Sequence, residues 1–311
     1  MRTRKLGTAE ISVIGFGAWE AGGASWGEGP GDEGSIAAIQ AAIEAGITWL
    51  DTAEIYGDGR SEEVVARAIA GLDPKPFVAT KVAASVSGYT PEGVRLGAEG
   101  SLRRLGLEVI DLYQIHWPDE SAAPLETTWE AMAKLVDDGL VRHIGVSNFD
   151  RSLIERCEAI RHVDSLQNHF SMLHRGRDAE LFPWCERNGT AVLAYGPLAY
   201  GLLTGHIGMD TEFEPDDWRS GQVQPSLYYE EFYAPSARAI HLETIDALRP
   251  IAEDLGITLS QLALAWVVAQ SGVTSAIAGS RNPDHVRTNA AAGDVIIDTA
   301  KLDLLNEILQ G

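Results

Sequence analysis

The sequence predicts an α/β fold, a (β/α)8 (TIM) barrel in which eight parallel strands close into a cylinder inside a ring of helices. Eight short β-rich runs alternate with longer helical patterns, which implies parallel strands joined by right-handed crossovers. Many of the runs are continuously apolar, as expected of strands that are covered on both faces. Because such barrels commonly reach this length as one domain, we expect a single domain over residues 1–311.

The expected elements follow one another regularly. Strands are expected at Ser12–Gly17, Thr48–Thr52, Phe77–Lys81, Ile110–His116, His143–Ser147, Ser165–Asn168, Ala191–Tyr195 and Ser275–Gly279. Helices are expected near 35–45, 61–70, 91–105, 124–138, 150–160, 178–188, 240–254, 259–270, 283–292 and 299–309. The segment 4–11 suits a short N-terminal β-hairpin that closes the bottom of the barrel.

An open doubly wound sheet is the rival architecture. Its dinucleotide signature is GxGxxG between the first strand and a helix. Here Gly15 and Gly17 are followed by Glu20 at the third glycine position, and a glycine-rich loop stands where the helix should begin. The signature therefore fails twice, and the closed barrel is favoured.

One connection is unusually long. Residues 196–239 follow the seventh strand and contain four prolines and seven aromatic residues. A loop of this length in a compact domain is usually functional or disordered, and its aromatic content argues against disorder. Because it leaves the carboxyl end of a strand, where barrel active sites are built, we interpret it as a lid over the site.

Composition excludes several partners. The net charge is −21, from 45 acidic and 24 basic residues, which argues against nucleic acid and anionic membranes. No apolar stretch approaches a membrane span, and no signal-peptide core follows the basic start. Cys157 and Cys185 lack metal-binding spacing and are expected to be buried thiols. We expect a soluble cytoplasmic protein and leave its oligomeric state open.

Four polar side chains are expected at one rim of the barrel. Asp51, Lys81 and His116 end successive predicted strands, and Tyr56 lies five residues after the first of them. A phenol has a pKa near 10, which a neighbouring cation lowers. Lys81 can supply that cation, Asp51 can hold the lysine, and His116 can donate to a carbonyl oxygen. Each residue alone has an ordinary structural explanation, but together they predict reversible carbonyl reduction with Tyr56 as the acid.

With these motifs in place, the sequence resembles the aldo-keto reductase family, in particular a bacterial branch with a long loop after strand seven. The resemblance rests on segments that span nearly the whole chain in the family's order: 51–57 (DTAEIYG), 105–116 (LGLEVIDLYQIH), 145–149 (GVSNF), 167–168 (QN), 194–198 (AYGPL) and 279–283 (GSRNP). It implies catalytic roles for Asp51, Tyr56, Lys81 and His116 and an extended NADP(H) molecule bound without a Rossmann domain.

The resemblance also implies which residues contact the cofactor. Ser147, Asn148 and Gln167 correspond to groups that bind the nicotinamide carboxamide, and Tyr195 to the aromatic residue that stacks on the nicotinamide. Hydroxyl and amide groups at strand ends suit an amide ligand, although Ser147 or Asn148 could equally cap a helix. The full expected set is Gly17, Trp19, Asp51, Ser147, Asn148, Gln167, Tyr195, Gly196, Leu198, Gly201, Gly279, Ser280, Arg281, His285 and Asn289.

The loop after strand eight bears on the choice of cofactor. Pro283 suits the first position of a helix, whose N-terminus favours an anion, and Arg281 could pair with a phosphate. Other branches of the family carry a lysine, an arginine and a glutamate where this chain has Gly279, His285 and Thr288. NADPH is the expected cofactor, with NADH as the alternative.

The substrate side is expected to be aromatic. Trp19, Trp26, Tyr56, His116 and Trp117 are the candidate pocket residues, together with aromatic residues of the lid. No metal is expected, because His162, His169 and His174 do not form an HExxH pattern.

The partner expected from all this is a small carbonyl compound. Two other functions remain open: an NADP(H)-binding redox sensor or regulatory subunit, and a sugar or alcohol dehydrogenase that works in the oxidative direction.

Overall fold

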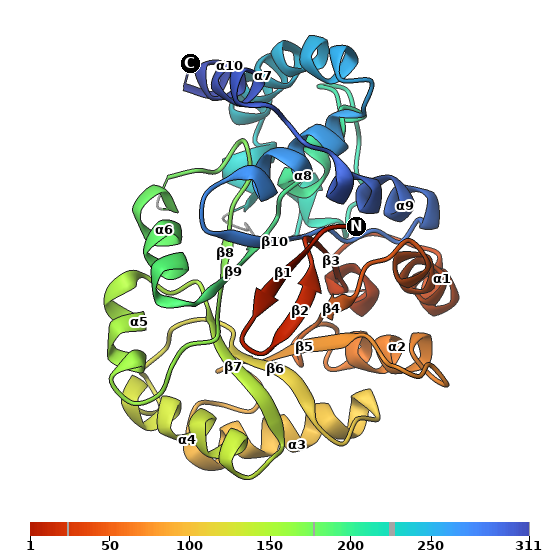
Figure 1. Ribbon diagram of the computed structural model, residues 1–311. Coiled ribbons are helices and arrows are strands. Elements are labelled where there is room, and N and C mark those ends of the chain that lie inside the picture. Colours follow the sequence, from red (N-terminus) through yellow and green to blue (C-terminus); the bar gives the residue numbers. More distant parts are fainter. Residues whose placement is uncertain (24, 177, 224–227, 311) are drawn as a thin grey trace.

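Eight parallel strands close into a barrel, as the sequence predicts (Figure 1). The structure is a computed structural model that describes residues 1–23, 25–176, 178–223 and 228–310. Around the barrel the order is β10-β3-β4-β5-β6-β7-β8-β9, and all neighbours pair in parallel. The strands are β3 Ile14–Gly17, β4 Trp49–Asp51, β5 Phe77–Val82, β6 Ile110–Ile115, β7 Val141–Ser147, β8 Ser165–His169, β9 Ala191–Tyr195 and β10 Val273–Ile277.

Helices surround the barrel on the outside (Figure 1). They are α1 Gly31–Glu44, α2 Arg60–Ala68, α3 Pro91–Leu105, α4 Leu125–Asp137, α5 Arg151–Glu158, α6 Asp178–Asn188, α7 Pro235–Asp254, α8 Leu259–Ala269, α9 Pro283–Ala291 and α10 Thr299–Gln310. Local sequence explains several helix starts. Thr258 and Gln261 form a reciprocal capping box at α8, and the Thr90 hydroxyl accepts a hydrogen bond from the Gly93 amide at α3.

Several element boundaries differ from the prediction, among them the starts of α1, α7 and β10. Helix α7 begins at Pro235, five residues before the expected start, because proline suits a first helical position, where the N–H that it lacks would have no partner within the helix. The eighth barrel strand is Val273–Ile277, shifted toward the N-terminus of the chain from the expected 275–279. The loop that follows β10 therefore begins at Ala278.

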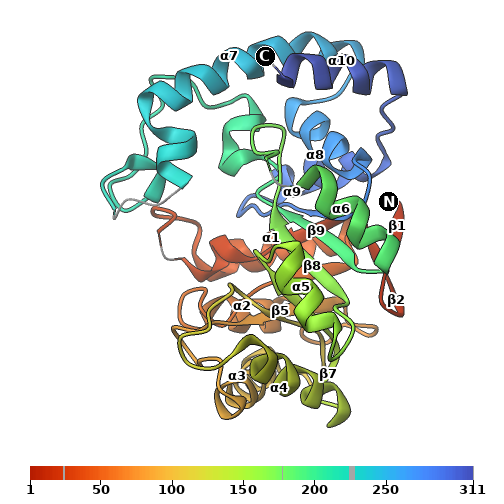
Figure 2. The ribbon, with the colours of Figure 1, turned by 90° about the vertical axis from the view of Figure 1, so that its left-hand side faces the viewer.

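The expected hairpin is formed by β1, Thr3–Leu6, and β2, Ala9–Ser12. Its Leu6 and Ile11 side chains are fully buried and pack with Trp49 and other residues that point into the barrel. The hairpin thus plugs the amino-terminal end of the cylinder. Figure 2 shows it at the opposite end from the segment that follows β9.

The long segment after β9 is folded. It contains the short helical turns Ala199–Thr204 (η2), Trp218–Ser220 (η3) and Tyr229–Tyr233 (η4), while residues 224–227 lie outside the described residues. Trp218, Phe232 and Tyr233 are buried, which agrees with the inference that the aromatic residues oppose disorder. The segment packs over the carboxyl-end rim, where the lid is expected, so its aromatic residues reach the cavity described below.

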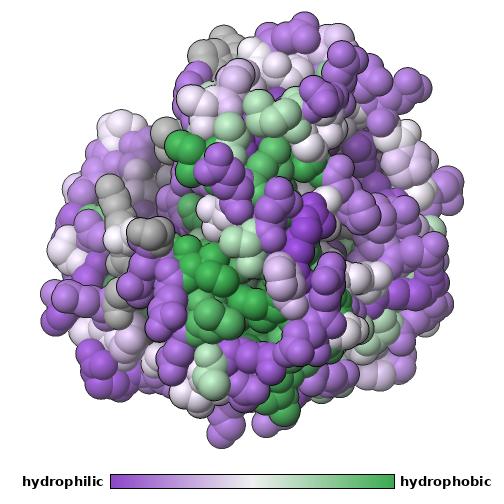
Figure 3. Space-filling view, turned by 90° about the horizontal axis from the view of Figure 1, so that it is seen from above, coloured by the Kyte–Doolittle hydropathy of each residue, from purple (hydrophilic) through white to green (hydrophobic). Residues whose placement is uncertain are grey.

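One face of the molecule has a hydrophobic centre. In the view from above, hydrophobic residues gather near the middle of the face and hydrophilic residues surround them (Figure 3). No single helix within the described ranges is long and apolar enough to cross a membrane. In the described part of the chain, one pair of helices, α7 with α8, meets the test of length and composition when taken together, and the chain bends by 90° between them.

Candidate active site

A cavity of about 1300 Å³ opens at the carboxyl-end rim of the barrel. It exceeds the roughly 300–1,000 Å³ of a typical small-molecule site, so it has room for a large ligand and a smaller one. Every candidate cofactor and substrate residue predicted from the sequence lines it, and so do Asp51, Tyr56 and His116. The remaining member of the predicted tetrad, Lys81, lies fully buried beneath the cavity floor.

A buried ion pair forms that floor. Lys81 Nζ lies 2.7 Å from Asp51 Oδ2 and donates a second hydrogen bond of 2.8 Å to the Thr52 carbonyl oxygen. The other oxygen of Asp51 accepts a hydrogen bond of 2.8 Å from Gln167 Nε2. The carboxylate is therefore held from two sides, by groups from β5 and β8.

Tyr56 and His116 lie together above this pair. Their rings meet edge to face with centroids 5.6 Å apart, and Lys81 Nζ lies 5.2 Å from the centroid of the Tyr56 ring. The chain turns sharply after Tyr56 because Gly57 has φ +61°, and a Cβ there would lie 2.2 Å from the Gly22 carbonyl oxygen. A glycine at 57 thus lets the Tyr56 loop pack directly on the loop after β3.

The pKa values correct one part of the sequence-based expectation. Burial raises the pKa of Tyr56 well above 10, and the nearby Asp51 charge acts in the same direction, whereas the sequence predicted a lowered value. The reason is that Asp51 neutralises the Lys81 cation and burial disfavours the phenolate. Burial likewise lowers the pKa of His116 to about 3, with Lys81 contributing. At neutral pH the site therefore holds a protonated phenol beside a neutral imidazole.

The three amide-binding candidates bond to one another and to their neighbours. Asn148 has φ +64°, and its Nδ2 donates to the His116 carbonyl oxygen at 3.1 Å and to Ser147 Oγ at 3.0 Å. Its Oδ1 accepts from the Tyr195 hydroxyl at 2.7 Å. Such a strained backbone at a polar residue is typical of functional sites. Gln167, as described above, is turned toward Asp51.

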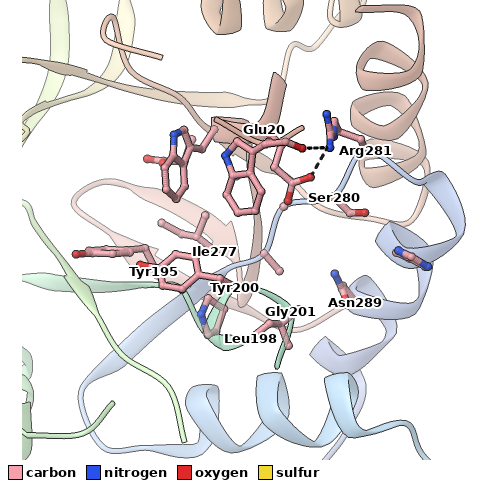
Figure 4. Close-up of a pocket in the computed structure, with 18 of the residues that line it drawn as sticks. Glu20, Tyr195, Leu198, Tyr200, Gly201, Ile277, Ser280, Arg281 and Asn289 are labelled. Atoms are coloured by element: carbon pink, nitrogen blue, oxygen red, sulfur yellow. Dashed lines mark hydrogen bonds and ion pairs between the residues drawn. The ribbon is translucent and has the colours of Figure 1, made fainter. Parts of the chain in front are cut away.

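The opposite end of the cavity lies at the start of α9. Ser280, His285 and Asn289 line it, and Figure 4 shows Ser280 and Asn289 on the same side of the pocket. Arg281 lies there too, but its guanidinium donates to the Trp26 carbonyl oxygen at 2.8 Å and lies 3.6 Å from the Glu20 carboxylate (Figure 4). The expected phosphate partner thus also ties the loop after β3 to the loop after β10.

Aromatic rings form much of the substrate side. Trp19 packs edge-on against Trp26 with centroids 4.9 Å apart, and its ring centroid lies 6.2 Å from that of Tyr56. Trp26 is almost completely buried, with the Arg219 guanidinium 5.0 Å from its ring centroid, whereas Trp117 is half-exposed at the rim. Of the sequence-predicted pocket residues, Trp26 therefore mainly supports the wall.

Some lining residues were not singled out from the sequence. Polar or charged examples are Glu20, Arg219, Thr258 and Ser260. Thr258 carried a usable signal, since a Thr-x-x-Gln pattern predicts a helix start and α8 begins at the cavity edge. Nothing local marks Glu20, because its role depends on Arg281, far along the chain.

A histidine cluster lies behind Tyr195. His169, His174 and Glu231 offer ligand atoms within 4.8 Å of one another, which sequence spacing did not indicate. The two imidazoles, however, are stacked with centroids 4.1 Å apart and planes 19° from parallel. Because the lone pairs of an imidazole lie in the ring plane, those of stacked rings do not converge on one point. The two histidines are therefore arranged as stacked rings and not as the ligands of a metal ion.

The comparisons agree with this site. The Aldo/keto reductase family model matches residues 13–310. Aldo-keto reductase YhdN of Bacillus subtilis is 33% identical over 310 residues, covering 97% of this chain and 91% of the relative. The NADH-specific methylglyoxal reductase of Escherichia coli is 30% identical and covers 100% of this chain and 99% of its own.

Solved structures give the same result. A glycerol dehydrogenase from Gluconobacter oxydans superposes with a TM-score of 0.86 at 32% identity, covering 99% of this chain and 94% of that one. An aldo-keto reductase from Klebsiella pneumoniae in complex with NADPH has a TM-score of 0.76 at 32% identity, with 99% and 96% coverage. The chain therefore belongs to the aldo-keto reductase family of NAD(P)H-dependent carbonyl oxidoreductases.

Proposed function

We propose that this protein is an NADPH-dependent reductase of aldehydes and some ketones, in which one barrel domain carries the whole site and Tyr56 is the general acid. The observation that carries the proposal is the position of Tyr56. Its ring shares a cavity wall with His116 and lies above the buried pair of Asp51 and Lys81. The cofactor bound by the structural relative from Klebsiella pneumoniae supports the choice of NADPH.

The residues present fit a nicotinamide dinucleotide. The cavity runs from amide and hydroxyl groups at Ser147 and Asn148 to the amino-terminal end of α9, where backbone N–H groups favour an anion. Between these ends, glycines let the backbone approach closely. A Cβ at Gly279 would lie 2.4 Å from the Gly17 carbonyl oxygen, so a larger residue there would push the two loops apart.

Each end of the cavity would then have its own task. Ser147, Asn148 and Gln167 would hold the nicotinamide carboxamide, and Tyr195 would support one face of the ring. Gln167 and the Nδ2 group of Asn148 would exchange their present protein partners for the ligand, while Asn148 Oδ1 would keep the hydrogen bond from the Tyr195 hydroxyl. Ser280, Arg281, His285 and Asn289 would hold the adenosine end. Arg281 would do this while keeping its hydrogen bond to the loop after β3.

When bound, the reduced nicotinamide supplies a hydride to the carbonyl carbon. His116 donates a hydrogen bond to the carbonyl oxygen, and the Tyr56 hydroxyl transfers its proton to that oxygen as negative charge develops on it. The product is an alcohol. Lys81 lies below the phenolate that remains and stabilises it, while Asp51 fixes the position of the lysine. The high pKa of Tyr56 keeps the acid protonated at neutral pH, which favours reduction.

The test is oxidation of NADPH by an aromatic aldehyde, followed by the loss of absorbance of the reduced cofactor. The wild type is expected to turn over steadily, and Tyr56→Phe to lose a factor of roughly 10² to 10⁴ in kcat. Tyr113→Phe is the matched control, because the buried Tyr113 hydroxyl has no hydrogen-bond partner among the described residues and does not line the cavity. Unchanged turnover in Tyr56→Phe would reject the assignment of the acid.

A further inference from the structure

Tyr195 is backed by a stack of two histidine rings. His169 lies directly opposite Tyr195 in the register of β8 and β9, so both side chains project to the same side of the barrel sheet. Their rings are 14° from parallel, with centroids 5.2 Å apart. His174 then stacks on His169, 19° from parallel at 4.1 Å. Three nearly parallel rings thus form a column that ends at the cavity wall.

The outer ring is tied to the segment after β9. A tight turn returns the chain from β8, because Ser171 Oγ accepts hydrogen bonds from the amides of Leu173 and His174. His174 Nδ1 contacts the Glu231 carboxylate of η4. The outer ring of the column is therefore held in place by its contact with the Glu231 carboxylate.

The middle ring is enclosed. His169 is 7% exposed, and its Nε2 has no hydrogen-bond partner among the described residues. Burial lowers the pKa of His169 to about 3, with His174 contributing, so the ring is neutral at physiological pH. A Cβ at position 196 would lie 2.7–2.8 Å from this imidazole, which explains a glycine with φ +64° there. The glycine thus leaves space for the imidazole, while its Nε2 finds no hydrogen-bond partner in the part of the chain that the structure describes.

We propose that His169 is a positioning residue: it backs Tyr195 and thereby fixes the plane on which the nicotinamide ring stacks. The inference rests on the proposed function for the role of Tyr195. A deeply buried ring nitrogen with no hydrogen-bond partner, as Nε2 of His169 is among the described residues, is unfavourable by itself. Its contribution here is a flat face against the tyrosine, since aromatic pairs in this geometry attract one another beyond the burial of their area.

The position of the column explains why this contact matters. A tyrosine ring free to rotate would offer the nicotinamide no fixed surface, and ordering the ring would then reduce binding. Tyr228 Oη lies 3.1 Å from Tyr195 Oη, and Asn148 Oδ1 accepts a hydrogen bond from the Tyr195 hydroxyl. The hydroxyl end of the Tyr195 ring is therefore already fixed. His169 supplies the remaining constraint, which is the rotation of the ring about its long axis.

The experiment compares His169→Leu with His169→Phe, both of which fill the space of the imidazole. Dissociation constants are measured for NADPH and for 2′-phospho-ADP-ribose, which is the same cofactor without its nicotinamide. We expect His169→Leu to weaken NADPH binding roughly twofold to tenfold, the range of an aromatic pair, and to leave 2′-phospho-ADP-ribose unchanged. His169→Phe should restore most of the NADPH affinity. His162→Leu, at a half-exposed histidine paired with Glu158, is the matched control.

The outcomes are distinct. Equal weakening of both ligands in His169→Leu, no weakening of either, or equal effects of leucine and phenylalanine would overturn the proposal. If His169→Leu does not fold, it binds neither ligand, and His174→Leu on the partly exposed outer ring takes its place. That variant should also weaken NADPH binding and not 2′-phospho-ADP-ribose binding, by a smaller factor. If the wild type itself binds no NADPH or NADH, the proposed function fails instead.

Discussion

Removing Lys81 should destabilise the protein far more than removing an exposed lysine. Lys81 is fully buried, and its ammonium makes hydrogen bonds of 2.7 Å to Asp51 and 2.8 Å to the Thr52 carbonyl oxygen. The change Lys81→Met keeps the side-chain length but leaves a buried carboxylate without its cation. Gln167 remains as a neutral donor to Asp51 and relieves only part of this cost.

The magnitude follows from the burial of the pair. Removing one partner of a buried ion pair costs about 3–5 kcal/mol, because the remaining charge is uncompensated. For a chain of 311 residues, with an unfolding entropy of about 2.1 cal/mol/K per residue, this corresponds to a fall in Tm of roughly 5–8 °C. The double change Lys81→Met with Asp51→Asn should recover part of the loss, since it removes the unpaired charge as well.

Thermal and urea unfolding of the cofactor-free protein measure this effect. The control is Lys134→Met, which removes an exposed lysine paired with Asp138 one helical turn away and should cost about 0.5 kcal/mol or less. The buried pair would not be what holds the cavity floor in either of two cases. Lys81→Met could lose no more unfolding free energy than the control, or the double variant could lose more than the sum of the losses of the two single variants.

Three further outcomes follow from the structure. Gly57→Ala should lower the free energy of unfolding in urea more than Gly139→Ala does. Both glycines have positive φ, but of the two only a Cβ at position 57 would meet backbone, at 2.2 Å from the Gly22 carbonyl oxygen. Equal losses in the two variants would refute this clash. Arg281→Leu should raise the Kd of NADPH more than that of NADH, because the guanidinium lies at the adenosine end of the cavity; a parallel rise would mean that it only ties loops. The pKa of His169 is lower in the folded protein, about 3, than the usual 6.5, so stability should fall as pH drops through this window by up to about 1.4 kcal/mol per pH unit. His169→Phe should show a correspondingly smaller pH slope, and an unchanged slope would contradict the assignment.

The sequence was sufficient to predict the barrel and the residues that lie at its carboxyl-end rim. Alternation of apolar runs with helical patterns specifies parallel strands, and parallel strands bring all their carboxyl ends to one side. The sequence alone therefore places Asp51, Lys81 and His116 near one another. The position of Pro283 at a helix start was predicted, and the Thr258 cap could have been, because each depends only on residues next to it in the sequence.

Contacts between distant loops could not be predicted in this way. The pairing of Arg281 with Glu20 joins residues more than 250 positions apart, and the contact of His174 with Glu231 depends on how the segment after β9 folds back. The predicted lowering of the Tyr56 pKa was wrong for a related reason. It depends on burial and on the neutralisation of Lys81 by Asp51, which no spacing in the sequence reveals.

A crystal structure with NADPH bound tests the central claim most directly. We expect the nicotinamide ring to stack on Tyr195, with its carboxamide at Ser147 and Asn148 and its other face open toward Tyr56 and His116. A nicotinamide held elsewhere in the cavity, or a bound ring whose open face is blocked by protein and leaves no space beside Tyr56, would contradict it.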